Sequence, residues 1–262
     1  MVITQRRFLI VGNWKENHTI APLTDFILDV INSSEYSAEA LQVVIAPAMI
    51  HIARAKELLR RDIPVAAQTC SPYSFGAYTG EVSSEMLKDL GVHWVLSGHS
   101  ERRRIFGETD EITAMKVKRI SAVGLHPIIC VGEELADRQA GKATTAVLSQ
   151  LHSLKDAVND WRSVVLCYEP VWAVGSGVCA SPGQAQDMHL VIRNWVGDNI
   201  GVEAAGQVTI IYGGSVNESN CKELILQADI DGFLVGGASI QPQFRALIEA
   251  TSKAHSEKYP GN

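Results

Sequence analysis

Long hydrophobic runs are missing from this sequence of 262 residues. The apolar run nearest the N-terminus, Phe8–Val11, is too short for the core of a secretory signal peptide. No segment offers the roughly 20 consecutive apolar residues that a membrane-spanning helix needs. We therefore expect a cytoplasmic protein without a membrane partner.

Paired cysteines and positive charge are scarce as well. The five cysteines are an odd number and form no Cys-x-x-Cys motif, which argues against a disulfide framework and a zinc cluster. The eight histidines show no ligand-like spacing, so no metal site is predicted. The net charge of −6 argues against a nucleic-acid partner. A protein of this charge that binds an anionic substrate must gather positive potential locally.

What the sequence does contain is a regular series of strand-like runs. Most of them are continuously apolar, as expected of strands that are covered on both faces. Eight such runs recur: Phe8–Val11, Val43–Ala46, Val65–Gln68, Trp94–Ser97, Ile128–Val131, Val164–Tyr168, Val208–Tyr212 and Phe233–Val235.

Helical periodicity fills the segments between these runs. Apolar stripes are formed by Leu23, Ile27, Val30 and Ile31, by Met86, Leu87 and Leu90, and by Met188, Val191, Ile192 and Trp195. Eight alternating units predict an α/β fold, a parallel sheet closed into a (β/α)8 TIM barrel. We predict one domain over residues 1–262, with its core at about 8–250 and a polar, frayed tail at about 252–262.

A glutamate directly follows the sixth run. Glu169 precedes Pro170 and lies where a barrel strand ends, on the face that carries active sites in this fold. Taken alone, such a residue is more often a solvated loop glutamate. Pro170 stiffens the backbone beside it, and Trp172 to Gly177 combines an apolar body with flexible glycines, as a lid does. A lid that excludes water favours Glu169 as a general base.

An imidazole and a cation follow two other runs. His99 lies between Trp94–Ser97 and a helix start at Ser100, and the positive end of the helix dipole favours a neutral ring that donates to a carbonyl oxygen. Lys15 follows the first run, with Asn13 placed to hold its ammonium group. A fixed cation attracts a phosphate and stabilises an enediolate. A structural histidine and a surface lysine are the ordinary alternatives.

Two glycine-rich turns close the seventh and eighth runs, Gly213-Gly214-Ser215 and Gly236-Gly237. In this barrel the loops at these positions bind phosphate through backbone amides and a short helix, for which Ala238–Pro242 is a candidate. The pattern from Gly175 to Ala180 matches a dinucleotide fingerprint. It lacks the direct strand-to-helix context and a suitably placed acid, so no nicotinamide site is predicted.

Together these segments resemble the triosephosphate isomerase family from about Phe8 to Ala250. Five motifs carry the resemblance: Gly12-Asn-Trp-Lys15, Gly98-His-Ser-Glu-Arg-Arg103, Tyr168-Glu-Pro-Val-Trp-Ala-Val-Gly175, Tyr212-Gly-Gly-Ser-Val216 and Asp231-Gly-Phe-Leu-Val-Gly-Gly-Ala-Ser239. The resemblance implies interconversion of dihydroxyacetone phosphate and D-glyceraldehyde 3-phosphate through an enediol, without a metal or organic cofactor.

The resemblance also implies the role of each site residue. Glu169 corresponds to the base, His99 to the electrophile and Lys15 to the catalytic cation. The implied substrate-binding residues are Asn13, Lys15, Gly175, Ser215, Gly236 and Gly237, and the supporting residues are Ser100, Glu101 and Tyr212. The lid comprises Pro170, Val171, Trp172, Ala173, Val174, Gly175, Ser176, Gly177, Val178, Cys179 and Ala180.

A homodimer is implied in the same way, because the family's long loop after the third strand inserts into the partner. Here that loop is Thr69–Glu81, with Thr79 as the inserted threonine and Glu81 paired with Arg102 across the boundary. Glu16 and Thr69 depart from the methionine and asparagine that are common in the family at this interface.

Thiol reactivity is a separate expectation. Cys70 lies in the long loop and Cys179 lies in the lid. We expect both thiols to be accessible.

Two other functions stay open at this stage. The same groups would isomerise a longer ketose phosphate, and kinetics on three- and four-carbon substrates separate that activity from the first. A non-catalytic barrel used as a binding protein would be free to lose the base, the imidazole or the cation, and all three are present.

Overall fold

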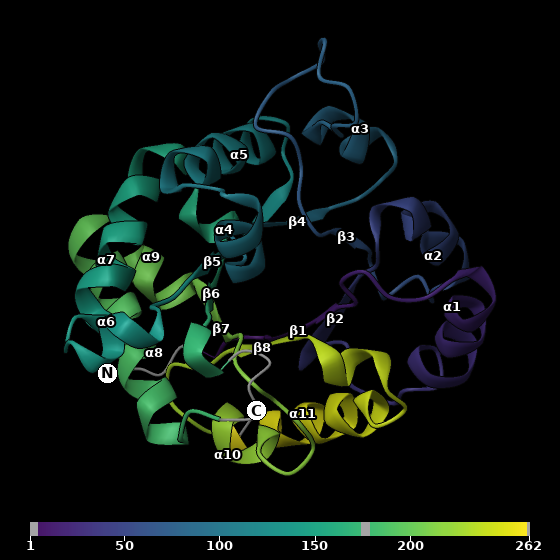
Figure 1. The fold of residues 1–262 in the computed structure, drawn as a ribbon. Coiled ribbons are helices and arrows are strands. Elements are labelled where there is room, and N and C mark those ends of the chain that lie inside the picture. The colour runs from purple at the N-terminus through teal and green to yellow at the C-terminus, as the bar shows by residue number, and fades with distance from the viewer. Residues whose placement is uncertain (1–4, 174–178, 261–262) are drawn as a thin grey trace.

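The computed structural model describes residues 5–173 and 179–260, which form a barrel of eight parallel strands. Figure 1 shows the strands at the centre and the helices around them. All eight predicted runs contain a strand, so the predicted (β/α)8 barrel is confirmed. The strands are β1 (Phe8–Asn13), β2 (Leu41–Ala46), β3 (Ala66–Ala67), β4 (Trp94–Ser97), β5 (His126–Val131), β6 (Val165–Tyr168), β7 (Thr209–Tyr212) and β8 (Gly232–Val235).

The cylinder closes where β2 meets β3, since the strand order is β2-β1-β8-β7-β6-β5-β4-β3. Ile45 forms a parallel bridge with Val65 at this seam, and its amide donates to the Pro64 carbonyl at 3.1 Å. The third strand is shorter than its run predicted. Beyond it, the side-chain amide of Gln68 donates to the carbonyl oxygens of Lys15 and Ala46, each at 2.9 Å.

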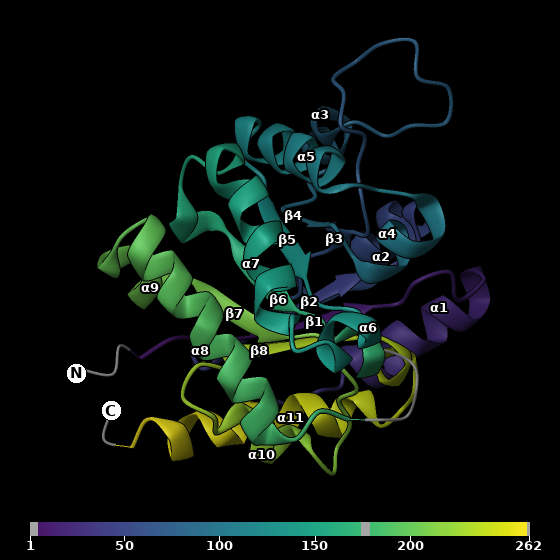
Figure 2. The same ribbon diagram turned by 60° about the vertical axis from the view of Figure 1, so that its left-hand side comes forward.

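Helices cover the outside of the barrel, as the turned view in Figure 2 also shows. None in the described part of the chain is long and apolar enough to cross a bilayer. The α-helices are α1 (Ile20–Phe26), α2 (Ile52–Leu58), α3 (Ser84–Asp89), α4 (Ser100–Phe106), α5 (Asp110–Ala122), α6 (Leu135–Gln139), α7 (Ala143–Leu154), α8 (Pro182–Asn199), α9 (Val202–Gln207), α10 (Cys221–Ile225) and α11 (Phe244–Lys258). Shorter turns are η1 (Ile27–Ile31, π-helical) and the 3-10 turns η2 (Met49–His51), η3 (Lys155–Ala157), η4 (Trp161–Ser163), η5 (Val171–Ala173) and η6 (Gly237–Ile240).

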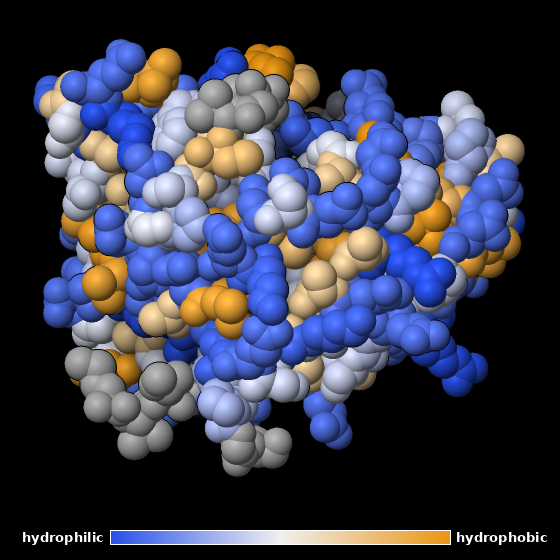
Figure 3. All heavy atoms as spheres, turned by 90° about the horizontal axis from the view of Figure 1, so that it is seen from below, coloured by the Kyte–Doolittle hydropathy of each residue, from blue (hydrophilic) through white to orange (hydrophobic). Residues whose placement is uncertain are grey.

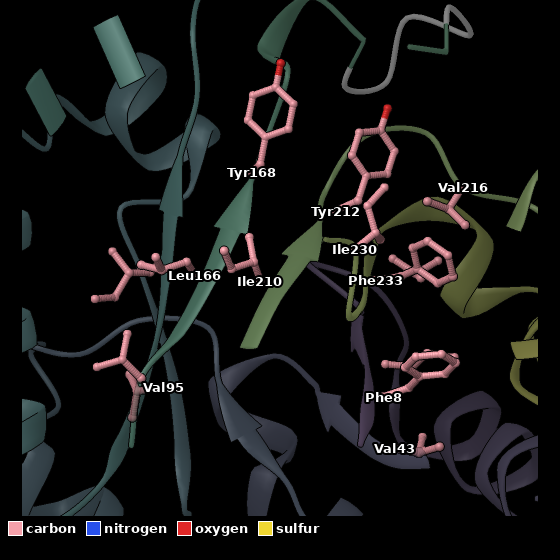
Figure 4. Packing of buried hydrophobic residues seen from close by; sticks show 14 of the residues in the cluster. Phe8, Val43, Val95, Leu166, Tyr168, Ile210, Tyr212, Val216, Ile230 and Phe233 are labelled. Atoms are coloured by element: carbon pink, nitrogen blue, oxygen red, sulfur yellow. The ribbon is translucent and has the colours of Figure 1, made fainter. Parts of the chain in front are cut away.

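Alternate residues along each strand point to opposite sides of the barrel wall. One buried set consists of strand residues and fills the barrel interior: Leu9, Val11, Val44, Ala46, Ala66, Leu96, Ile128, Cys130, Val165, Cys167, Ile211 and Leu234. The other set packs against helix residues outside the wall. Figure 4 shows members of this outer layer, among them Phe8, Val43, Val95, Leu166, Ile210 and Phe233. Burial on both faces explains why the runs are continuously apolar.

One predicted helical stripe is wrong. Leu87 is buried on α3, but Met86 and Leu90 are exposed. This helix is six residues long and directly follows the long loop, so it packs against the barrel through a narrow face.

The predicted frayed tail is also wrong, because α11 continues to Lys258. Ser252 and His255 are buried on it, and the His255 ring contacts the Arg6 carbonyl at 3.3 Å. The Lys258 ammonium donates to the carbonyl oxygens of Ile225 and Ile230 at 3.0 and 2.6 Å. Polar side chains that find main-chain partners at the barrel end hold this segment in place.

Candidate active site

The carboxyl ends of the strands surround a cavity of about 340 Å³. Asn13 ends β1, Glu169 directly follows β6, and His99 lies just beyond β4. The structure thus brings together side chains that are far apart in the sequence. The cavity is lined by Asn13, Lys15, His99, Glu169, Cys179, Gly213, Gly214, Ser215, Val216, Asn217, Leu234, Gly236, Gly237 and Ala238.

Glu169 continues the inward-pointing series of β6 after Val165 and Cys167, which explains why its carboxylate enters the barrel mouth. It is 2% exposed. Its Oε2 accepts a hydrogen bond from the Ser100 amide at 2.9 Å, and its Oε1 lies 3.0 Å from His99 Nε2. Both carboxylate oxygens therefore have a donor in this structure.

The predicted helix start at Ser100 is confirmed, because α4 begins there, and the His99 side chain caps the helix. Its Nδ1 accepts a hydrogen bond from the Glu101 amide at 3.2 Å, so that nitrogen carries no proton. The proton of the neutral ring is then on Nε2, the atom that faces Glu169. A neutral imidazole with an Nε2–H donor is the form suited to a substrate oxygen.

Lys15 has a left-handed backbone conformation with φ of 53°, which is uncommon outside glycine. The Asn13 carboxamide oxygen accepts from the Lys15 amide at 3.1 Å, and Gln68 donates to the Lys15 carbonyl at 2.9 Å. The Lys15 ammonium lies 2.5 Å from a Glu101 oxygen. Asn13 thus fixes the backbone of Lys15, whereas the sequence predicted that it would hold the ammonium group. Gln68 was not predicted, because its partner lies 53 positions away.

The predicted phosphate turns line the same cavity. Gly213 has no room for a side chain, since an added Cβ would lie 2.7 Å from Cys167 Sγ and 2.8 Å from Glu169 Cγ. At Gly214 an added Cβ would lie 2.1 Å from the Tyr212 hydroxyl oxygen. The predicted short helix is present as η6, which begins at Gly237 rather than at Ala238.

The first residues of the predicted lid are attached to a buried carboxylate that the sequence analysis missed. Glu133 Oε1 accepts hydrogen bonds from the Trp172 indole at 2.8 Å and from the Tyr168 hydroxyl at 3.1 Å. Burial, together with Glu133, raises the pKa of Tyr168. The Arg138 guanidinium lies over the Trp172 ring at 4.4 Å. Ser215 adds a contact by donating to the Ala173 carbonyl at 2.9 Å.

The predicted lid is described only at its two ends, residues 170–173 and 179–180. Val174, Gly175, Ser176, Gly177 and Val178 lie outside the described residues, so the predicted phosphate contact of Gly175 stays a prediction. Val171 and Ala173 are buried in η5, and Ala180 is buried at the other end.

The residues assigned to an interface are mostly on the surface. Glu16, Thr79 and Glu81 are exposed. Thr69 accepts a hydrogen bond from the buried Lys116 ammonium at 2.9 Å. Arg102 forms an ion pair with Glu108 of its own chain, and its predicted pairing with Glu81 of a second chain stays a prediction.

The two cysteines expected to be accessible differ in their exposure to solvent. Cys179 is exposed, but Cys70 is 2% exposed, so its predicted accessibility is wrong. The start of the long loop turns inward, and burial raises the pKa of Cys70 to about 12.

A maleimide is therefore expected to modify Cys179 in the native protein and to leave Cys70, Cys130, Cys167 and Cys221 unmodified, because these four thiols are buried. Peptide mass spectrometry after brief labelling measures this. Cys179→Ser should remove the native label, whereas unfolding should expose all five thiols to it. Modification of Cys70 in folded protein would contradict the described packing.

Comparison with known proteins gives the family. A family model described as triosephosphate isomerase matches residues 8–251. The chain belongs to the triosephosphate isomerase family. The cytosolic triosephosphate isomerase of Oryza sativa subsp. japonica is 44% identical over 248 residues, which cover 94% of this chain and 98% of that relative. The resemblance inferred from five motifs is confirmed over nearly the same part of the chain.

Proposed function

We propose that Glu169, His99 and Lys15 carry out the reaction of the triosephosphate isomerase family, the interconversion of dihydroxyacetone phosphate and D-glyceraldehyde 3-phosphate in glycolysis and gluconeogenesis. The observation that carries the proposal is the pair of Glu169 Oε1 and His99 Nε2, 3.0 Å apart, in one cavity with Lys15 and two glycine turns. A carboxylate, a neutral imidazole and an ammonium group supply the three functions that an enediol route requires.

In the proposed sequence the phosphate binds the turns at Gly213–Ser215 and Gly236–Gly237, near the start of η6. Glu169 removes a proton from C1 of dihydroxyacetone phosphate and returns it to C2. His99 donates its Nε2 proton to the carbonyl oxygen and moves protons between the two oxygens of the enediol. Lys15 stabilises the negative charge that develops on those oxygens. The proton transfers use the side chains of Glu169 and His99, and the proposed reaction needs no cofactor.

Glu169 must turn before it acts. Its Oε2 accepts from the Ser100 amide and its Oε1 faces His99, so neither oxygen is free for a substrate carbon. The lid begins directly after Glu169, at Pro170. Closure of the lid over a bound phosphate is therefore the step we propose for releasing the carboxylate from Ser100.

A coupled assay tests this function. Purified protein should convert glyceraldehyde 3-phosphate into dihydroxyacetone phosphate, detected by a dehydrogenase that reduces the product with NADH. Glu169→Gln, which keeps the size of the side chain but removes the base, is the control. Equal rates for the two proteins would contradict the assignment of Glu169.

The two alternative functions, isomerisation of a longer ketose phosphate and a purely binding role, are less well supported. A ketose phosphate with four carbons would use the same groups, but the family match favours the three-carbon substrate. A purely binding role is disfavoured because the base, the imidazole and the cation are all retained around one cavity. Rates measured side by side on three- and four-carbon ketose phosphates distinguish the two substrate specificities.

A homodimer is the assembly that best accounts for the exposed apolar side chains. Ile50, Phe75 and Phe106 are 85%, 67% and 63% exposed, on segments that follow β2, β3 and β4. The loop from 69 to 81 projects from the barrel beside α3 (Figures 1 and 2). The face turned away from it is mainly polar, with small scattered apolar areas (Figure 3).

Phe75→Asp is expected to convert dimers into monomers, because it places a charge in the apolar contact. Turnover should fall with it, since the family pattern places the partner's Thr79 beside Lys15. Sedimentation and the coupled assay measure both effects. Val202→Asp is a matched control, because Val202 is 84% exposed on α9, away from the loops after β1 to β4. A fully active monomer would refute the proposed contribution of the partner.

We further propose a cytoplasmic location. The relative from Oryza sativa subsp. japonica is named a cytosolic enzyme. All five cysteines are free thiols, as is usual for proteins of a reducing compartment.

A further inference from the structure

Two buried cysteines lie directly beneath the proposed base. Cys130 on β5 and Cys167 on β6 are paired in the strand register, and both belong to the cluster that fills the barrel interior. Each is 0% exposed. The Cys167 sulfur lies against Gly213, a residue of the cavity wall, so one backbone segment separates this thiol from the cavity.

The two sulfurs and a Glu169 carboxylate oxygen all lie within 4.8 Å of one another. Among residues 5–173 and 179–260, this is the one group of three His, Cys, Asp or Glu side chains close enough to share an ion. We propose that Cys130, Cys167 and Glu169 form an inhibitory binding site for a soft divalent cation such as Zn²⁺ or Cd²⁺.

The donor set and its dimensions fit such an ion. Thiolate sulfur prefers soft cations, and two thiolates with one carboxylate leave a fourth tetrahedral position for a water molecule. Zinc–sulfur bonds of about 2.3 Å at a tetrahedral angle require sulfurs roughly 3.8 Å apart. The two sulfurs, which lie within 4.8 Å of each other, therefore need to approach by about 1 Å at most.

In the metal-free protein burial favours the protonated form of both thiols. The hydrogen bond to Cys167, followed by burial, raises the pKa of the Cys130 thiol well above its usual value, and burial raises that of Cys167. Glu169 adds to both shifts, and Arg103 on α4 opposes that of Cys130. Binding thus forms two metal–sulfur bonds and one metal–oxygen bond, and it releases two protons to solvent. The complex of one dication, two thiolates and one carboxylate has a net charge of −1.

Inhibition follows because the ion engages the carboxylate that takes the substrate proton. Glu169 can then turn neither from Ser100 nor toward a substrate carbon. This consequence rests on the proposed role of Glu169 as the base. Metal binding itself does not depend on that role, so binding and inhibition are tested by different measurements.

The experiment titrates the full-length protein with Cd²⁺ in the presence of a phosphine reductant, since thiol reductants chelate the ion. Ultraviolet thiolate-to-cadmium absorption reports binding, and the coupled assay reports activity on the same samples. We expect one Cd²⁺ per chain, loss of activity in parallel with absorption, and recovery on adding EDTA. Each variant's rate is expressed relative to its own metal-free rate.

Cys167→Ala should remove the absorption and weaken inhibition by more than roughly 100-fold. Cys130→Ser provides a second test should the first variant not fold. Cys179→Ser, which removes the exposed thiol of the same cavity, should leave the Cd²⁺ absorption and the Cd²⁺ concentration for half-inhibition unchanged, whatever its metal-free rate. Full absorption in both Cys167→Ala and Cys130→Ser, or loss of absorption in Cys179→Ser, would refute the proposed binding site. Saturating absorption with undiminished activity would overturn the inhibition.

Discussion

Shortening Glu169 to aspartate is expected to lower kcat by roughly 10²–10⁴-fold. The carboxylate retracts by one carbon–carbon bond, and a small misplacement of a catalytic group is enough to remove most of its effect. The fold should be unaffected, because the backbone amide of Glu169, which donates to the Val131 carbonyl at 2.8 Å, is retained. Steady-state kinetics and a thermal melt measure the two effects.

The matched control is Glu111→Asp, since Glu111 is an exposed residue of α5 outside the cavity. It should leave kcat and the melting temperature unchanged. If Glu169→Asp keeps a near-normal kcat, Glu169 is not the base. If instead KM rises while kcat is preserved, the side chain serves binding rather than proton transfer.

Replacing Lys15 by methionine has the second largest expected effect, a loss of roughly 10²–10³-fold in kcat together with weak substrate binding. Among the described residues that line the cavity, Lys15 is the one with a permanent positive charge. Methionine keeps much of the aliphatic stem, which packs near the backbone of Gly236. The change therefore tests the charge rather than the packing.

Lys15→Met also leaves the Glu101 carboxylate without its partner, 2.5 Å away in the parent protein. The double variant with Glu101→Gln separates repulsion by that carboxylate from loss of the cation. Lys222→Met, at an exposed lysine of α10, is the control. Tight binding of a phosphoglycolate-type inhibitor by Lys15→Met, measured by calorimetry, would contradict the role of the ammonium group.

The barrel was predictable from the sequence because its strands are buried on both faces. Runs such as Ile128–Val131 are apolar at every position, and both alternating sets of side chains are packed. Glu169, His99 and the glycine turns were predictable from their position after such runs. A local pattern was enough for each of these inferences.

What the sequence analysis missed depends on partners that are remote in the chain. Glu133 holds Trp172 from 39 positions away, and Gln68 holds Lys15 from 53. Cys70 is buried although it belongs to a loop, because the loop turns inward at its start. The polar end of α11 was predicted to be a tail because the partners of its side chains are remote in the chain. His255 contacts the carbonyl of Arg6, 249 positions away, and Lys258 donates to that of Ile225, 33 positions away.

The left-handed backbone of Lys15 has a consequence for affinity. Such a conformation costs about 1–3 kcal/mol, which folding supplies through the contacts of Asn13 and Gln68. A freely rotating lysine would instead lose up to about 2 kcal/mol of side-chain entropy when it meets its ligand. Here Asn13 and Gln68 fix the backbone of Lys15, and the Glu101 carboxylate, 2.5 Å away, holds its ammonium group. Less of the interaction energy with a triose is therefore lost to ordering the protein.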